Sequence, residues 1–353
     1  MKKSIKFILI IASSVIGSFC LLYFLGGYVA AICVADALFA KRQSTADPSP
    51  EGFSGTTFRT REDLPGLSSR IEVGFPSGDK QLQGYFYPCE NPKGTFLFAH
   101  GLRGYADDQS ALVQNYLLNQ GYCVFSFDMR ASGRSEGDGL SSLADGAYDV
   151  KAALDYLFTQ NEFFTPMGEL FLAGYSWGAY SVGAALNFDY PSPIKGVLSF
   201  SGFVDPEAEM IEMARNYVGS LADFTSLTLD WGLATKAGED RRLSAANGIL
   251  SSGCKAFLIQ GDNDSTVPLK ASLYASLEES ERVHKALRQG FTHAYPWLSE
   301  NAFELTNNTL KSLYKELGEE GYRRYLLENP SLKDRANEID EGLLKEAIRF
   351  LKE

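Results

Sequence analysis

One serine of this chain has the surroundings of a catalytic nucleophile. Ser176 lies at the centre of Gly174-Tyr175-Ser176-Trp177-Gly178, directly after the apolar run Glu169–Ala173 and before a segment with helical apolar spacing. A serine on a tight strand-to-helix turn has strained backbone geometry, and glycines two residues to either side let neighbouring backbone pass closely. The pattern therefore predicts a nucleophile elbow, with the Ser176 hydroxyl exposed above the end of a sheet.

A serine hydroxyl is a weak nucleophile at neutral pH and needs a base within hydrogen-bond reach. The sequence contains three histidines. His100 ends one apolar run and is expected to be structural, and His284 lies inside another and is expected to be structural or exposed. His293 lies in the loop Gly290-Phe291-Thr292-His293-Ala294, which is the kind of position that a mobile base needs. We therefore expect His293 to be the general base.

The base in turn needs a carboxylate to orient it. Two aspartates follow the apolar run Lys255–Gln260. Asp264 is far enough from the strand end to reach across the top of the sheet, whereas Asp262 is close enough to brace the turn instead. Asp205, which follows an earlier strand, is a third candidate. We favour Asp264, which gives the chain order serine, aspartate, histidine.

The tetrahedral intermediate of acyl transfer needs donors to its oxyanion, and loss of one donor costs about 2.7–4 kcal/mol. The residue after the nucleophile and the loop after an early strand usually supply two backbone amides. Here these are the amides of Trp177 and of Leu102, in the loop His100-Gly101-Leu102-Arg103-Gly104. His100 is accordingly expected to brace that loop.

These segments together resemble the α/β-hydrolase superfamily, and within it the serine hydrolases of the monoglyceride-lipase and serine-aminopeptidase type, which include membrane-anchored bacterial members. The resemblance covers about residues 69–299 and the final helix. Besides the elbow, its motifs are Phe98-Ala99-His100-Gly101, Phe127-Asp128-Met129-Arg130-Ala131-Ser132-Gly133-Arg134-Ser135-Glu136-Gly137, Asp264-Ser265-Thr266-Val267-Pro268 and Gly290-Phe291-Thr292-His293. The family usually has glycine where this chain has Ala131. Asp128, Arg130 and Ser135 are expected to order their loop and not to take part in the chemistry.

The elements expected to position these residues form an α/β fold with a mostly parallel, eight-stranded sheet and helices on both faces. The predicted strands are Ile71–Phe75, Gln81–Tyr87, Thr95–Ala99, Tyr122–Phe127, Glu169–Ala173, Lys195–Ser201, Lys255–Gln260 and Arg282–Leu287. The predicted helices are Gln109–Asn119, Leu143–Phe158, Ala179–Asn187 and Glu341–Leu351. The resemblance implies the same fold.

Two stretches interrupt this alternation. Residues 203–253 are much longer than a usual crossover and contain the helix-compatible run Pro206–Val218, so we expect a lid-like insertion. Residues 300–335 form a second helical insertion. Each insertion is either a part of the pocket wall or a group of surface helices packed on the domain. The hydrolase domain is thus predicted to span residues 69–353.

The first 40 residues have a different character. From Phe7 to Ala35 there are 29 residues without a charge, and a helix needs about 20 apolar residues to cross a bilayer. Lysines at positions 2, 3 and 6 favour a cytoplasmic N-terminus. We expect a retained single-pass anchor at 1–40, a Ser-, Thr-, Gly- and Pro-rich tether at 41–68, and a catalytic domain outside the cytoplasm. The alternative is a signal peptide cleaved near Ala35-Asp36-Ala37, which would make the protein secreted.

Composition limits the partners further. The 353 residues carry a formal charge of -11, and the part after residue 40 has 30 basic and 43 acidic residues, or -13. Nucleic acid is an unsuitable partner because phosphate contacts need clustered cations. The odd number of cysteines after residue 40 (Cys89, Cys123 and Cys254) argues against a disulfide framework, and the sequence has no metal-binding motif.

The resemblance and the predicted site imply acyl transfer to water through an acyl-enzyme, without metal, nucleotide or organic cofactor. Aromatic residues near the elbow (Tyr175, Trp177, Tyr180 and Phe203) are either ordinary core residues or the wall of an apolar acyl pocket. The expected substrate is a short- or medium-chain carboxylic ester, then a lipid or thioester, then a peptide or amide. Dehalogenase and epoxide hydrolase chemistry would need an aspartate in place of Ser176. A non-catalytic, membrane-tethered binding module is the alternative from another class.

Overall fold

The computed structural model describes residues 2–44, 64–106, 110–159, 168–219, 228, 230–232, 234–235 and 237–353. Its centre is an eight-stranded sheet in the order β1-β2-β4-β3-β5-β6-β7-β8. The strands are β1 (Ile71–Ser77), β2 (Lys80–Tyr87), β3 (Gly94–Ala99), β4 (Cys123–Phe127), β5 (Glu169–Tyr175), β6 (Gly196–Phe200), β7 (Lys255–Gly261) and β8 (Val283–Arg288). Each lies within two residues of its predicted bounds.

Strand direction follows from the connections between strands. The hairpin β1–β2 is antiparallel, and β2 also pairs with β4 in the antiparallel sense. All pairs from β4 through β8 are parallel. The central strands are buried on both faces, which explains their continuous apolar sequences. The predicted fold class, α/β with a mostly parallel eight-stranded sheet, is confirmed.

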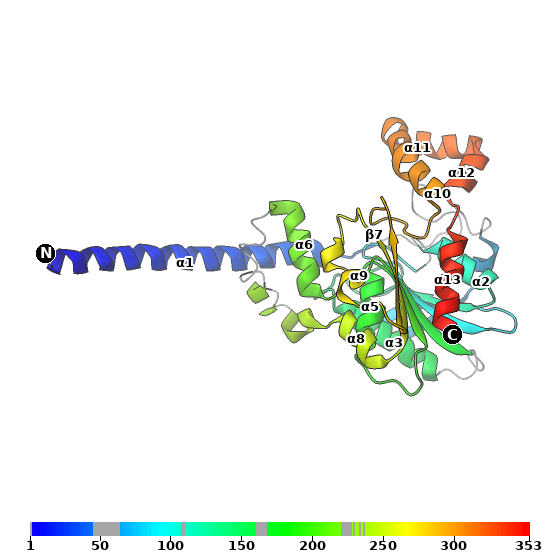
Figure 1. The fold of residues 1–353 in the computed structure, drawn as a ribbon, viewed down its shortest axis with the longest axis horizontal. Coiled ribbons are helices and arrows are strands. Elements are labelled where there is room, and N and C mark those ends of the chain that lie inside the picture. Colours follow the sequence, from blue (N-terminus) through cyan, green and yellow to red (C-terminus); the bar gives the residue numbers. More distant parts are fainter. Residues whose placement is uncertain are drawn as a thin grey trace.

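Helices cover both faces of this sheet (Figure 1). One face packs against α3 (Asp145–Thr159), α5 (Trp177–Ala185) and α8 (Ala245–Ser252), and the other against α2 (Ala111–Asn119) and α13 (Glu341–Lys352). In α13 the buried residues are Leu343, Leu344, Ala347 and Leu351, a stripe with helical period that faces the sheet. Because parallel strands end at one edge of the sheet, the loops after β3, β5, β7 and β8 meet there.

Both insertions contain helices. The first includes α6 (Pro206–Val218), as predicted, and the short η2 (Gly238–Arg242). The second contains α10 (Glu300–Glu304), η4 (Leu305–Leu310), α11 (Lys311–Glu328) and α12 (Pro330–Ala336). It has its own small apolar cluster, made by Leu310, Tyr322, Leu326 and Ala336. The remaining short elements are η1 (Pro65–Leu67), η3 (Leu269–Ala271) and α9 (Leu273–Ser276).

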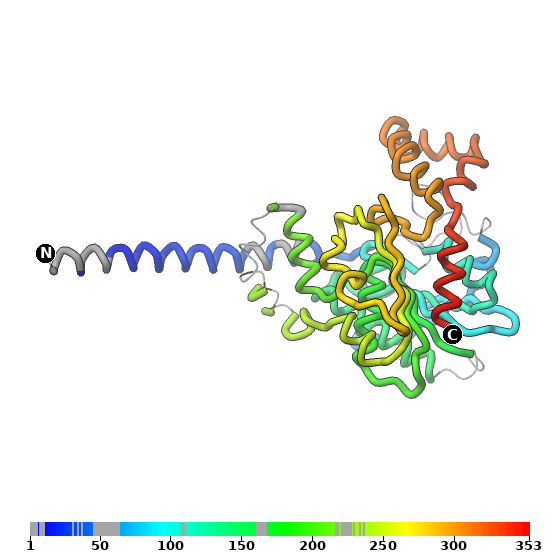
Figure 2. The backbone as a smooth tube through the Cα atoms, in the orientation of Figure 1, coloured from blue at the N-terminus to red at the C-terminus, as the bar shows by residue number. Residues whose placement is uncertain are grey.

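The N-terminal helix α1 (Lys2–Phe39) extends away from the domain as a long rod (Figure 2). Within the described part of the chain it is the one helix long and apolar enough to cross a membrane, over Ile11–Val29. Its last turns are packed, with Ala35, Leu38 and Phe39 buried in the domain, and further up the helix the Tyr28 ring contacts Trp231 of the first insertion. The predicted tether is described only at 41–44 and 64–68, since 45–63 lie outside the described residues.

The loop after β4 is held by buried polar groups. Asp128 accepts hydrogen bonds from the Tyr85 hydroxyl and from two backbone amides, and the Ser135 hydroxyl donates to the Asp128 carbonyl. The Arg130 guanidinium binds Asp149 on α3, with Nη2 at 2.7 Å from Oδ1. The pKa of Asp149 is nevertheless raised, because burial of the carboxylate has a larger effect than the charge of Arg130. These contacts order the loop, as expected of Asp128, Arg130 and Ser135.

Candidate active site

The turn between β5 and α5 has the geometry of a nucleophile elbow. Ser176 has φ 54° and ψ -118°, a conformation that non-glycine residues rarely adopt. A Cβ atom on Gly174 would lie 2.4 Å from the Gly178 carbonyl, and one on Gly178 would lie 2.0 Å from the Ala99 carbonyl oxygen. The two glycines therefore allow β5, α5 and the end of β3 to meet, which fixes the strained turn on which Ser176 lies.

Three side chains from different loops form a continuous hydrogen-bonded chain at the edge of the sheet. The Ser176 Oγ lies 2.8 Å from His293 Nε2. The other ring nitrogen of His293, Nδ1, lies 2.8 Å from Asp264 Oδ2. With the proton on Nδ1, the imidazole donates to the carboxylate and accepts from the hydroxyl. This is the arrangement in which a serine can lose its proton as it attacks.

Asp264 is fully buried as a side chain and yet well supplied with donors. Its Oδ1 accepts from the amides of Thr266 and Val267, both at 2.9 Å. Its Oδ2 accepts from Gln260 Nε2 at 2.9 Å in addition to His293. These bonds hold the carboxylate in one orientation. The sequence motifs do not single out Gln260, and its only local signal is an amide at the end of an otherwise apolar strand.

The other two aspartates considered for this role have different partners. Asp205 caps α6, and its Oδ1 accepts from the Ala208 amide at 2.8 Å. Asp262 Oδ1 accepts from the Gly290 amide at 2.7 Å, so this residue braces the turn, the role weighed for it from the sequence. Among these three candidates, the structure brings Asp264 to His293.

The other two histidines also have structural surroundings. His100 is completely buried, its Nε2 accepts from the Met129 amide at 2.9 Å, and burial lowers its pKa to about 4. It thus joins the loop after β3 to the loop after β4. His284 lies between Glu279 and Glu346, at 2.7 Å and 3.3 Å, and contacts the rings of Phe257 and Phe350. Neither reaches Ser176.

The two residues expected to supply the oxyanion donors lie in different local structures. Trp177 is the first residue of α5, where a backbone N–H has no acceptor within the helix. Leu102 lies in the turn closed by the bond from the Gly104 amide to the Gly101 carbonyl. Both residues line the same cavity as Ser176. The positive end of the α5 dipole also favours negative charge here.

A cavity of about 230 Å³ adjoins the Ser176 hydroxyl. Most of its lining side chains are apolar, and they come from five parts of the chain: Leu38, Leu102, Leu143, Tyr175 with Trp177, and Phe203 with Met213. Tyr180 is not among the lining residues, since its ring stacks on Phe203 and its hydroxyl donates to the Leu243 carbonyl. Helix α6 contributes to the wall, whereas the described residues of the insertion 300–335 do not line it.

Glu209 is a polar residue of this wall that no sequence motif singles out. It lies on α6, is 4% exposed, and its Oε2 has no hydrogen-bond partner. Burial, and secondarily the charge of Asp264, raise the pKa of Glu209 well above its usual value. The carboxyl is therefore expected to be neutral at pH values where an exposed glutamate is ionised. Acidic positions in amphipathic helices are usually exposed, so the sequence pattern gave no signal.

This shift predicts how stability depends on pH. The folded state keeps the Glu209 proton that the unfolded state loses near pH 4.5, so stability declines as pH rises from there toward the folded-state pKa, by up to about 1.4 kcal/mol per pH unit. Glu209→Gln cannot ionise, and we expect it to gain stability relative to wild type between pH 5 and pH 8 in urea unfolding. The exposed Glu278→Gln is the control. Parallel pH profiles of wild type and Glu209→Gln would contradict the assignment.

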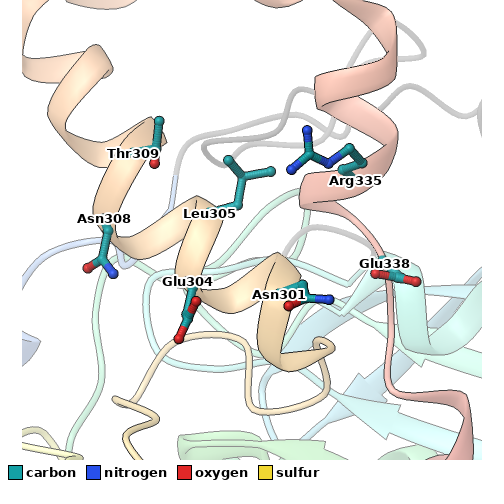
Figure 3. A pocket seen from close by; sticks show the side chains of 7 residues that line it. All are labelled: Asn301, Glu304, Leu305, Asn308, Thr309, Arg335 and Glu338. Atoms are coloured by element: carbon teal, nitrogen blue, oxygen red, sulfur yellow. The ribbon is translucent and has the colours of Figure 1, made fainter.

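A second hollow, of about 530 Å³, lies in the insertion 300–335 and not at the sheet edge. Figure 3 shows its lining, with Asn301, Glu304, Leu305, Asn308 and Thr309 on one helical segment, and Arg335 and Glu338 across from them. The described residues that line it include neither serine nor histidine. It therefore lacks the components of nucleophilic catalysis found at Ser176.

Comparison with known proteins adds to this geometry. Residues 90–247 match the family model described as serine aminopeptidase, S33. The matched part contains Leu102 and Ser176, whereas Asp264 and His293 lie beyond it. No curated protein matches the chain.

The chain is also similar to several solved structures. An esterase of Pyrococcus furiosus is 19% identical, with 70% of this chain and 91% of that chain covered and a TM-score of 0.49. The acylaminoacyl peptidase of Pyrococcus horikoshii is 20% identical, with 64% of this chain and 38% of that chain covered and a TM-score of 0.47. Est1E of Butyrivibrio proteoclasticus, solved with ferulic acid, is 20% identical, with 69% of this chain and 98% of that chain covered and a TM-score of 0.47. The chain therefore has the α/β-hydrolase fold, and its residues 90–247 resemble the serine aminopeptidase family.

Proposed function

We propose that this protein is a serine hydrolase that cleaves carboxylic esters with Ser176 as nucleophile, His293 as base and Asp264 as the orienting acid. The observation that supports the proposal best is the hydrogen-bonded chain through these three side chains, with both contacts at 2.8 Å. Its position beside an apolar cavity favours an acyl substrate. A binding module that had lost catalysis would have no reason to keep all three groups aligned.

The proposed reaction has two halves. In the first, His293 Nε2 takes the Ser176 proton while Oγ attacks the ester carbonyl, and the amides of Leu102 and Trp177 stabilise the oxyanion. The tetrahedral intermediate then collapses, the bond to the alkoxy group breaks, and that group leaves as an alcohol with the proton from His293. In the second half a water molecule gives its proton to His293 and attacks the acyl-enzyme, which releases the acid and restores the serine.

A serine aminopeptidase is the second candidate, and two observations favour it. One is the description of the family model that matches residues 90–247. The other is Glu209, whose unpartnered carboxyl in the cavity would be able to pair with a substrate amine. Hydrolysis rates measured with aminoacyl anilides and with nitrophenyl esters distinguish the aminopeptidase from the esterase. An aminopeptidase would lose activity selectively in Glu209→Gln, whereas an esterase for apolar acyl groups would not.

Covalent labelling tests the proposal directly. A fluorophosphonate probe is expected to label the wild-type protein and to leave Ser176→Ala unlabelled, while His293→Ala labels much more slowly because its serine is not activated. Ser201→Ala, which removes another serine at a strand end, is the matched control and should label like wild type. Absence of labelling in the folded wild-type protein would contradict the proposal and favour a binding module.

We also propose that α1 is a retained single-pass anchor with the catalytic domain outside the cytoplasm. The exposed apolar side chains along Ile11–Val29 support a membrane environment, since water would solvate them poorly. The alternative, cleavage near Ala35-Asp36-Ala37 during export, would give a secreted domain without the apolar span.

Two cysteines give a test of this location. Cys89 and Cys123 are free thiols whose Sγ atoms lie 2.6 Å apart, so a small movement would suffice to join them. In an oxidising compartment, where a disulfide-exchanging oxidase accepts the two electrons, we expect them to be joined. Maleimide should then modify three cysteines of the denatured protein before reduction and five after it. Modification of all five without reduction would contradict the proposed location.

A further inference from the structure

Tyr175, the residue before the candidate nucleophile, contacts the loop that carries His293. It is the last residue of β5 and is 6% exposed. Its hydroxyl donates a hydrogen bond of 3.1 Å to the His293 carbonyl oxygen. Its ring lies beside the imidazole, with the two ring centroids 5.3 Å apart. Tyr175 therefore contacts His293 both at the backbone and at the ring.

The backbone around His293 has few other restraints. Within the described part of the chain, no other hydrogen bond reaches the backbone of residues 292–294. Two residues after His293, Tyr295 has φ 54°, a left-handed conformation that persists in a tyrosine only where the surrounding structure imposes it. The loop after β8 therefore depends on side-chain contacts for its shape, and the Tyr175 hydroxyl supplies one of them at His293 itself.

A buried tryptophan supports the Tyr175 ring. Trp297 is completely buried, and its ring makes T-shaped contacts with Tyr175 at 5.2 Å and with Phe200 of β6 at 5.4 Å. Such edge-to-face pairs are favourable beyond the area that they bury. The Trp297 carbonyl also accepts from the Asp340 amide at 2.8 Å, at the start of α13. The end of the loop after β8 is thus joined to β5, β6 and α13.

The Tyr175 hydroxyl keeps its proton. Burial, and secondarily the charges of Tyr295 and Asp264, raise the pKa of Tyr175 well above its usual value. A phenol donates a hydrogen bond, whereas a phenolate has no proton to donate. The bond to the His293 carbonyl is therefore available at every pH below the usual tyrosine pKa of about 10.

From these contacts, we propose that Tyr175 is a positioning residue, which holds His293 where the imidazole reaches both Ser176 and Asp264. The inference rests on the proposed function and adds a residue to it. Both imidazole contacts are 2.8 Å long. A displacement of about 1 Å in a reacting group can cost about 100-fold in rate, so a loosened loop would slow proton transfer. Tyr175 takes no proton in the reaction and acts on its rate through His293.

Removal of the hydroxyl alone tests this role. Tyr175→Phe keeps the ring that lines the cavity. We expect kcat for nitrophenyl acetate, butyrate and hexanoate to fall by about 3–10-fold, as for the loss of one hydrogen bond, while KM changes by less than about twofold. An unchanged kcat would overturn the inference. So would a loss confined to one acyl length, because it would indicate contact with the substrate.

Tyr180→Phe is the matched control. The Tyr180 hydroxyl also donates to a backbone carbonyl at 3.1 Å, but its acceptor is Leu243, outside the loop after β8. Tyr180 is not among the residues that line the cavity. This variant should keep the kcat of the wild-type protein.

Coupling to His293 separates positioning from a merely structural role. In a His293→Ala background there is no base to position, so Tyr175→Phe should leave the already slow fluorophosphonate labelling of Ser176 unchanged. With His293 present, it should slow labelling by the same factor as kcat. Equal slowing in both backgrounds would overturn the inference.

A second variant covers the case in which circular dichroism shows that Tyr175→Phe does not fold. Trp297→Phe weakens the support of the Tyr175 ring, and the same dependence on His293 is expected of it. The wild-type protein, labelled in the same experiment, reports separately on the proposed function. Without wild-type labelling the proposed function fails, whereas labelling that is equal in wild type and Tyr175→Phe overturns this inference alone.

Discussion

Ser176→Ala and His293→Ala are each expected to lower kcat by about 10⁴–10⁶-fold, and the double variant by no more than the worse single variant. The reason is that the hydroxyl and the imidazole act as one unit, with Oγ and Nε2 2.8 Å apart, so loss of either stops proton transfer. Steady-state kinetics with a nitrophenyl ester gives these values. His284→Gln is the control, because His284 lies between Glu279 and Glu346 and should be replaceable at little cost.

Asp264→Asn extends this series and is expected to lower kcat by about 10⁴-fold. Asparagine keeps the shape of the side chain but can no longer hold His293 in the tautomer that accepts the serine proton. Because four donors converge on the Asp264 carboxylate, folding should be monitored by circular dichroism in parallel. Wild-type activity in a folded Asp264→Asn protein would refute the assignment of Asp264 as the orienting acid. Asp205 and Asp262 would then be the candidates for that role.

Asp149→Leu is expected to destabilise the protein by about 3 kcal/mol, the largest effect on stability predicted here. Removal of Asp149 leaves the mostly buried Arg130 guanidinium without the carboxylate oxygen Oδ1, to which its Nε and Nη2 both donate. Breaking a buried ion pair costs about 3–5 kcal/mol. We expect the lower end of this energy range because Asp145, 3.6 Å from Arg130, still offers the guanidinium a partner of opposite charge. Urea unfolding of wild type and variant gives the difference.

The control for this change lies on the same helix. Asp155 pairs with Lys151 one turn away, and both side chains are substantially exposed. Asp155→Leu should cost less than about 1 kcal/mol, because exposed ion pairs contribute little. If Asp149→Leu and Asp155→Leu destabilised the protein equally, the buried network would not be what orders the loop after β4.

Local sequence was sufficient for the elements that carry the site. The apolar runs of β5 and β7 are strands in any setting where both faces are covered, and glycines at 174 and 178 leave only a sharp turn between β5 and α5. The loop positions of His293 and Asp264 followed from the strands before them. With parallel strands, loops at the same edge must meet, so the order of residue types along the chain carried much of the site's geometry.

Other features depend on contacts that no local pattern contains. Gln260 looked like a strand residue, and its bond to Asp264 exists only because the loop after β7 folds back over the strand end. Glu209 looked like an exposed position of α6, and only the docking of α6 over the cavity buries it. The odd cysteine count argued against a disulfide framework, and the close approach of Cys89 and Cys123 arises from the packing of the β2 end against β4.

By itself, the sequence determined the strand order in the chain, the strained turn at Ser176, the candidate partners Asp264 and His293, and the apolar segment near the N-terminus. Those features depend on residues that are neighbours in sequence, or on the general geometry of parallel sheets. The tertiary structure alone decided which aspartate faces His293, that Glu209 is buried, and that Leu38 of α1 lines the cavity. Each of these depends on surfaces far apart in the chain, whose packing is selected by the complete core and not by any one segment.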